Sequence, residues 1–512
     1  MTFQGTHTRG GKAATRAATS ALALMMGTGG AMADVTPAEV WADWQRYMGS
    51  FDMAVNAQET QTDEGLELAD ITLTQTLPDD AGETVITVPE IVMRDNGDGT
   101  VAIVYPAEMP ISIAGKGLET YTLEMLYRTT DMVSTVSGDA SEMTYDYSAS
   151  GLGLTATGLE AEGETVDLGE IRFDLENLKG RTVMTLEEGR TANQQVMAGP
   201  ASYTFDVSDP EGGDTKIAGQ FETLEMMGKL VMPEGVDANE MSAALASGFA
   251  IDGGYVFGPG SSTFEATSGG NTTSGSTSSE GGKLTMRMDE EGLAYGVTSQ
   301  GLKVEALVPP LPFAVSMAME ETEFDLAVPL TQAEEPQDFA LNLLLGGLTL
   351  SDTAWSMIDG QNVLPRDPAT VALDVDGKAS ILADIMDPAQ MAQVEEQDDI
   401  PAQLDALTLN SLLVSLVGAE LTGEGAVTFD NTDTESYGGQ PKPVGAASFT
   451  LTGANTLLDR LVSMGMLGSE QAMMARMTLG MAAVPGDGED VLKSEIEFTE
   501  AGGIIANGQQ LK

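Results

Sequence analysis

Apolar and polar residues alternate with period two through most of the chain. The runs ITLTQTL from Ile71 and ETVITVPEIVM from Glu83 place an apolar side chain at every second position. This pattern is typical of a β-strand with one buried face. The turn residues DNGDGT at 95–100 lead into a further run, TVAIVYP, and together they predict a hairpin. Repeated strands and turns of this kind favour antiparallel sheets over parallel βαβ units.

Two more hairpins are predicted further along the chain. The segment 134–148 alternates on both sides of a glycine turn. The segment TVALDVDGKASILAD from Thr370 is predicted to turn at Asp376-Gly377, because Asp-Gly is a preferred hairpin pair. Alternation is strong again from Leu404. The predicted sheets therefore extend through both halves of the chain.

Helical spacing replaces the alternation near the start of the chain. Thr36 is a predicted N-cap, Pro37 suits the first helical position, and Glu39 stands at the capping-box position. Apolar residues then recur at helical spacing from Val40 to Phe51. These features predict an amphipathic helix at the start.

A helical pair is predicted near the end. Leu457, Leu461 and Val462 fall on one face of the segment 454–466. A second helix is predicted from Ser469, its N-cap, after a glycine turn. The expected fold class is therefore α+β and β-dominated, with long antiparallel sheets, an N-terminal helix and a C-terminal helical hairpin.

One segment has no apolar pattern. Residues 258–282, GPGSSTFEATSGGNTTSGSTSSEGG, are almost all Gly, Ser, Thr and acids, which is typical of a flexible loop or linker. The expected organisation is a signal peptide at 1–33, a β-rich region at 34–257, this loop or linker, and a β-rich region with the helical hairpin at 283–512. The segment either separates two domains or forms a long loop in one sheet system.

The first residues of the chain have the features of a secretory signal peptide. Three basic residues precede position 17, the apolar stretch ATSALALMM follows, and Ala31-Met32-Ala33 gives the small-x-small cleavage pattern. Cleavage there would leave Asp34 as the mature N-terminus. An adjacent arginine pair is absent from residues 1–33, so the general secretory route to the periplasm is expected.

Composition narrows the chemistry. The chain has no cysteine, and its single histidine, His7, lies in the segment expected to be removed. Nucleophilic catalysis that needs a histidine base or a thiol is therefore excluded for the mature chain, as are His/Cys zinc sites. No Gly-Lys pair is followed by Ser or Thr, so there is no P-loop. We assign no catalytic residue, no cofactor and no metal ligand from the sequence.

The formal net charge is −56, with 79 acidic residues spread along the chain. Such a charge repels phosphate backbones and anionic headgroups, so nucleic acid is not an expected partner. The longest apolar run after the signal peptide, from Phe339, is too short for a transmembrane helix. High solubility explains the charge better than a specific basic partner does, and loose pairing with divalent cations is compatible with it.

Two groups of residues raise the question of metal binding. Acidic turns suggest calcium, although none completes the spacing of a calcium loop and turn chemistry explains them equally; their aspartates are Asp95, Asp98, Asp374, Asp376, Asp430 and Asp433. Methionines recur at short spacing, and thioethers bind Cu(I), although core packing is the commoner reason for such methionines. They are Met286, Met288, Met317, Met319, Met464, Met466, Met473, Met474 and Met477.

The C-terminal region carries a family resemblance. The stretches LPRDPATVALDVDG from Leu364, IPAQLDALTLNSLLVSLVGAELTGEGAVTFDN, LLDRLVSMGMLGSEQAMMARMTLGMAAVPGDGEDVL and GIIANGQQL resemble the exported alphaproteobacterial family called domain of unknown function 2125. The resemblance implies an exported protein and brings no catalytic residues. The order of elements is also similar to that of β-rich envelope proteins of the AsmA type, which would imply a long sheet with an apolar face for lipid.

The leading hypothesis is an exported, non-enzymatic envelope protein that binds or scaffolds something, such as an apolar or lipid ligand or an envelope partner. The alternative is a carboxylate-based enzyme acting on envelope polymers, since paired carboxylates can catalyse glycoside hydrolysis without histidine or cysteine. A continuous apolar surface would favour the first hypothesis. Two paired carboxylates with a raised pKa would favour the second.

Overall fold

The computed structural model describes residues 34–77, 82–117, 120–166, 168–186, 189–209, 213–236, 240–333, 335–397 and 400–512. Most of these residues lie in antiparallel strands, and few lie in helices, so the predicted fold class is confirmed. The chain divides into two compact units between Ser274 and Gly275, inside strand β17 (Asn271–Ser279). Each unit is described by itself.

In the first unit, the described residues form strands and two helices, α2 (Pro37–Gly49) and α3 (Met241–Ala246). Its strands before β17 are β1 (Met53–Thr62), β2 (Gly65–Leu77), β3 (Gly82–Asp95), β4 (Val101–Val104), β5 (Glu108–Gly117), β6 (Tyr121–Thr130), β7 (Val133–Gly138), β8 (Glu142–Ala161), β9 (Glu164–Val166), β10 (Leu168–Thr185), β11 (Arg190–Ala198), β12 (Ala201–Asp209), β13 (Gly213–Phe221), β14 (Leu224–Met232), β15 (Ala250–Phe257) and β16 (Gly260–Ser268).

The sheet of this unit branches at three long strands, β3, β8 and β10. β3 pairs with β2 along one edge, while its other edge pairs with β5 in its first half and with β4 near its end. β8 joins the two branches again, because it pairs with β6 and with β7 on one edge and with β10 on the other. β10 then pairs with both β11 and β12, and each of these continues as a branch, β11–β14–β15 and β12–β13–β16.

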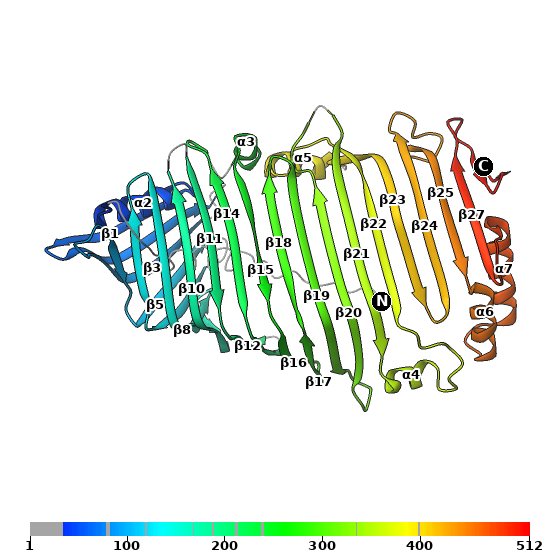
Figure 1. Cartoon of the computed structure of the whole chain (residues 1–512), viewed down its shortest axis with the longest axis horizontal. Helices are drawn as coiled ribbons and strands as arrows, with labels where there is room; N and C mark the ends of the chain where they lie inside the picture. The colour runs from blue at the N-terminus through cyan, green and yellow to red at the C-terminus, as the bar shows by residue number, and fades with distance from the viewer. Residues whose placement is uncertain are drawn as a thin grey trace. The chain divides into compact units, whose positions relative to one another are not determined.

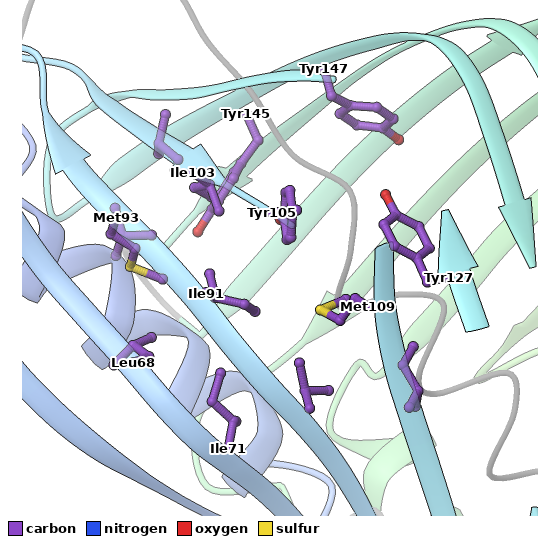
Figure 2. Close-up of a cluster of buried hydrophobic side chains, with 14 of the residues drawn as sticks. Leu68, Ile71, Ile91, Met93, Ile103, Tyr105, Met109, Tyr127, Tyr145 and Tyr147 are labelled. Atoms are coloured by element: carbon purple, nitrogen blue, oxygen red, sulfur yellow. The ribbon is translucent and has the colours of Figure 1, made fainter. Parts of the chain in front are cut away.

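The inward side chains of these strands form one buried core. Leu68 is 0% exposed, and Ile71, Ile86 and Ile113 are each 1% exposed. Figure 2 shows how aliphatic residues from β2 and β3 meet tyrosines from β6 and β8 in this core. Alternation along each strand places every second residue inside, as the sequence pattern predicted.

The N-terminal helix lies where the sequence predicted it. The Thr36 backbone N–H donates to Glu39 Oε2 over 2.9 Å, and the Glu39 N–H donates to Thr36 Oγ1 over 3.3 Å, which completes the capping box. Val40 and Trp41 are buried against the core. The helix therefore begins by local capping and is held by its apolar face.

A buried ion pair joins this helix to strand β11. The Arg190 Nη2 donates to Asp43 Oδ1 over 2.5 Å, and Nη1 donates to Asp43 Oδ2 over 3.2 Å. The Tyr145 hydroxyl donates to the same Oδ2 over 3.3 Å, and the Arg190 guanidinium lies 4.8 Å from the centre of the Tyr47 ring. Burial, followed by the Asp43 charge, raises the pKa of Tyr145, so this phenol stays neutral.

In the second unit, the described residues form one antiparallel sheet and four helices. Figure 1 shows the long strands of this sheet side by side in the order of the sequence. The helices are α4 (Asp352–Ile358), α5 (Pro388–Gln397), α6 (Ala454–Ser463) and α7 (Ser469–Ala482). The strands after β17 are β18 (Gly281–Asp289), β19 (Gly292–Leu307), β20 (Val315–Val328), β21 (Gln337–Leu350), β22 (Ala369–Ile381), β23 (Ala402–Leu416), β24 (Ala419–Asp430), β25 (Lys442–Thr452), β26 (Val484–Pro485), β27 (Val491–Phe498), β28 (Ile504–Ala506) and β29 (Gln509–Gln510). From β18 to β25 each strand pairs with the next in the sequence, and β27 follows β25.

The prediction of a hairpin at Asp376-Gly377 is wrong. Both residues lie inside β22, which runs unbroken from Ala369 to Ile381. A Cβ atom on Gly377 would lie 2.7 Å from the Phe339 ring and 2.2 Å from the Ala406 carbonyl oxygen. The glycine is needed because a neighbouring ring packs over it. Close approach of a neighbour is, besides a turn, a common reason for glycine in a strand sequence.

The prediction of a flexible loop or linker at 258–282 is also wrong. This segment forms β16, β17 and the start of β18. β16 pairs with β13 from Gly260 to Ser268, so its backbone groups are satisfied in a ladder. Five of the 25 residues are threonines, which favour strands, and a ladder needs no apolar content to form. The division between the two units nevertheless falls within this segment.

The helical hairpin near the C-terminus is confirmed as α6 and α7. Leu457, Leu461 and Val462 are half-buried. Ser469 is the first helical residue rather than the N-cap, which is Gly468. The short helix α4 is capped by Ser351, because the Ala354 N–H donates to Ser351 Oγ over 3.3 Å.

Helix α6 is capped from a distance. Its N-cap, Gly453, has no side chain, and the Asp490 carboxylate takes that role by accepting from the Asn455 N–H over 3.1 Å and from the Thr456 N–H over 2.8 Å. Burial acts to raise the pKa of Asp490, but the hydrogen bonds from Thr456 and Asn455 outweigh it and lower the pKa below its usual value.

We expect Asp490→Ala to destabilise the helical hairpin by about 1 kcal/mol, as other N-cap losses do. Because the folded-state pKa is lowered, this stabilisation is present above the usual aspartate pKa and is lost as pH falls through the folded value. Hydrogen exchange of the α6 amides measures it at neutral pH. Unchanged exchange in Asp490→Ala, with Asp487→Ala as the control, would show that the carboxylate does not cap the helix.

Candidate apolar binding face

A row of apolar residues crosses the sheet of the second unit from β19 to β25. Residues that pair directly across an antiparallel ladder share one face of the sheet. The register links them in the order Val297, Phe324, Leu343, Leu373, Leu412, Gly423 and Phe449. Each strand from β19 to β25 therefore contributes one residue to this row.

Two neighbouring rows on the same face are also mainly apolar. The first is Tyr295, Leu326, Leu341, Val375, Leu409, Gly425, Ala447 and Ile496. The second is Leu345, Val371, Val414, Leu421, Leu451 and Leu492. We call these three rows together the apolar face.

Glycines keep the apolar face continuous. A Cβ atom on Gly423 would lie 2.5 Å from the Phe449 ring, so the ring of one strand lies over the bare backbone of the next. Gly301 has a φ of 60°, a left-handed conformation, and the alternation of β19 shifts by one residue there, so that Leu302 and Val304 continue the less exposed side. Glycine adopts this conformation without the strain that other residues incur.

The apolar face is half-exposed, unlike the core of the first unit. Phe324 is 37% exposed, and Leu416, next to the row that contains Val414, is 44% exposed. Leu343 and Leu373 are half-buried. Among the described residues, all members of the main buried core cluster come from the first unit. Large aliphatic side chains that remain in contact with water gain free energy when they are covered.

The opposite face of the same sheet is mostly polar and carries paired carboxylates. Glu323 and Asp325 stand two residues apart on β20, and Asn342 donates to Glu323 Oε1 over 2.8 Å. A hydrogen bond with Asp325, then burial and the nearby negative charges, raise the pKa of Glu323. Asp374 and Asp376 are bridged by Asn410, whose Nδ2 lies 3.2 Å and 2.6 Å from their oxygens.

Of the aspartates considered for calcium, Asp374 and Asp376 lie inside strand β22 rather than in a turn, and the other four are turn residues or ion-pair partners. Asp95 Oδ1 accepts from the Gly97 N–H over 2.8 Å, as in an Asx turn. Asp430 and Asp433 each lie 3.2 Å from Lys442 Nζ. Within the described ranges, no three His, Cys, Asp or Glu side chains are grouped so that they could hold a metal ion.

The predicted cleavage residues Ala31 and Ala33 lie outside the described residues, and Asp34 is the first residue described.

The sequence pattern did not predict a cluster of buried tyrosines in the first unit, because tyrosine in an alternating strand gives no sign of its partners. Tyr105, Tyr127 and Tyr147 are each less than one-tenth exposed, and Figure 2 shows the hydroxyls of Tyr127 and Tyr147 directed toward each other. Burial raises the pKa of Tyr147 to about 12.

Among the helices that the structure describes, none has the length and apolar character needed to cross a membrane. The register and the exposure described above define the candidate site of the protein, which is the apolar face of the second-unit sheet. Comparison with family models, with curated proteins and with solved structures finds no match for this chain.

Proposed function

We propose that the protein is an exported envelope protein without enzymatic activity, and that the apolar face binds a lipid or a similar elongated apolar ligand. The observation that carries the proposal is the run of half-exposed aliphatic and aromatic side chains across seven paired strands, β19 to β25. An acyl chain can lie along such a row and exclude water from each side chain in turn.

Location in the periplasm rests on the predicted signal peptide and on the resemblance to an exported family. Both remain predictions from the sequence. They fit the proposed ligand, because lipids are abundant in the cell envelope. The net charge of −56 favours lipids with neutral or cationic headgroups over anionic ones.

The proposal predicts that one face of β21 matters for binding and the other does not. Leu343 lies in the central row, paired with Phe324 and Leu373, while its neighbour Leu344 lies on the opposite face, paired with Glu323 and Ala372. We expect Leu343→Gln to weaken binding of a fluorescent phosphatidylethanolamine roughly tenfold, because burying a leucine contributes about 1.5–3 kcal/mol. Leu344→Gln is the matched control and should bind as the parent protein does.

Mass spectrometry of lipids that copurify with the protein from native envelopes identifies the ligand independently. We expect the Leu343→Gln protein to carry less lipid than the Leu344→Gln protein. Equal binding by the two variants, or no binding by the parent protein, would contradict the proposed role of the apolar face.

The carboxylate-based enzyme remains the second candidate, and the raised pKa of Glu323 beside Asp325 favours it. Hydrolysis of a glycan needs one carboxyl group that stays protonated as the acid and a second that is ionised, and a raised pKa suits the first of these roles. The pair lies on a sheet surface rather than in a described pocket, so we rank it below the lipid proposal. Hydrolysis of an envelope polysaccharide that Glu323→Gln abolishes would reverse this ranking.

A further inference from the structure

Helix α7 presents a row of methionines to solvent. Met473 is 70% exposed, Met474 56%, Met477 63% and Met481 61%. With 3.6 residues per turn, these four positions fall within an arc of about 100° of the helix surface. Four large thioether side chains therefore share one uncovered side of a single helix.

The other side of α7 holds the helix in place. Ala472 is 2% exposed. The Arg476 Nη2 donates to Asp459 Oδ1 on α6 over 2.7 Å and to the Asn455 carbonyl oxygen over 3.2 Å. The methionine row is thus fixed in orientation by contacts on the opposite side.

Exposure changes the explanation for these methionines. From the sequence, core packing and Cu(I) binding were both open, and packing was the commoner reason. Side chains that are more than half exposed do not fill a core. Insertion into an anionic membrane surface does not suit the helix either, because its single basic residue, Arg476, is engaged with α6.

The spacing suits a soft metal ion. Met473 and Met477, and Met477 and Met481, are four residues apart, and Met474 and Met477 are three apart, so their side chains are neighbours on the helix. Each thioether stands on a flexible side chain, and thioethers select soft ions such as Cu(I). Glu470 is exposed on the same side, one turn before Met473 and Met474, and its carboxylate attracts cations.

The chain offers no thiol or imidazole outside the predicted signal peptide to compete with these thioethers. It has no cysteine, and its one histidine, His7, lies in the predicted signal peptide. The high negative charge raises the local concentration of any cation. We propose that the methionine row of α7 binds Cu(I) or the chemically similar Ag(I) through thioethers one turn apart, Met473 with Met477 and Met477 with Met481, with Met474 as a further ligand.

The test uses the mature chain and silver nitrate in chloride-free buffer, with calorimetry and with methyl NMR of labelled methionines. We expect saturable binding of Ag(I) and shifts of the Met473, Met477 and Met481 methyl signals. The triple variant Met473→Leu/Met477→Leu/Met481→Leu should lose affinity at least tenfold. Leucine preserves helix propensity and apolar area, so folding and any hydrophobic contact are kept while the thioethers are removed.

The matched control replaces three exposed methionines on strands, Met197→Leu/Met227→Leu/Met286→Leu. This variant should bind Ag(I) as the parent chain does. Titration with Cu(I), supplied with a competing chelator, should give the same order of affinities. Absence of saturable binding, equal binding by the α7 variant, or equal loss in the control would each overturn the proposal.

Discussion

Arg190→Ala should lower the free energy of unfolding by about 3–5 kcal/mol, because it leaves the Asp43 carboxylate buried without its partner. The Asp43 side chain is 0% exposed and that of Arg190 is 8% exposed, so water cannot easily replace either group. The same substitution removes the guanidinium from the Tyr47 ring. Helix α2 should lose its attachment to β11 as a result.

Denaturant unfolding followed by tryptophan fluorescence measures this effect. Trp41 and Trp44 lie on α2, and a Trp355→Phe background removes the third tryptophan of the chain. The double variant Asp43→Ala/Arg190→Ala should cost less than the sum of the two single variants, since it leaves no unpaired charge. Arg181→Ala, which breaks an exposed pair with Asp146, is the control and should have little effect. A change of less than 1 kcal/mol in Arg190→Ala would mean that the pair does not hold the helix.

The two units should respond very differently to the same leucine-to-alanine substitution. Leu68→Ala in the first unit should cost about 2–5 kcal/mol, because a fully buried leucine leaves a cavity in a packed core. Leu343→Ala in the second unit should cost about 1 kcal/mol or less, because its half-exposed side chain has less contact to lose.

Fluorescence of Trp41 and Trp44 reports on the first unit, and that of Trp355, on α4 beside β20, reports on the second. The measurement should use delipidated protein, since a bound ligand stabilises the state that it binds. Adding the ligand should then increase the cost of Leu343→Ala. A cost for Leu343→Ala as large as that for Leu68→Ala, without ligand, would show that the apolar face is a core rather than a binding surface.

Local features of the fold could be predicted from the sequence because their causes lie within a few residues. The capping box of Thr36 and Glu39, and the DNGDGT turn between β3 and β4, each depend on neighbouring residues. The alternation from Leu404 likewise predicted β23 and β24. It also implied an apolar side for each strand, so part of the apolar face could be expected from the pattern.

Only tertiary structure determined the remaining features, because their partners are far apart in the sequence. Asp43 and Arg190 meet across 147 positions. Asp490 caps α6 from 35 residues away, and Gly377 is required by the ring of Phe339 rather than by a turn. Pairing of β16 with β13 makes a strand from a segment whose composition is typical of a loop.

Alternation along a strand shows that one side is apolar, whereas burial depends on what packs against that side. The same period-two pattern gives Leu68 a fully buried position in the first unit and Leu343 a half-exposed position in the second. The methionines of α7 likewise have core-like spacing and an exposed location. Residue type and spacing determined the strands and helices of this protein, and the packing between distant segments decided which of their apolar sides remain open to a ligand.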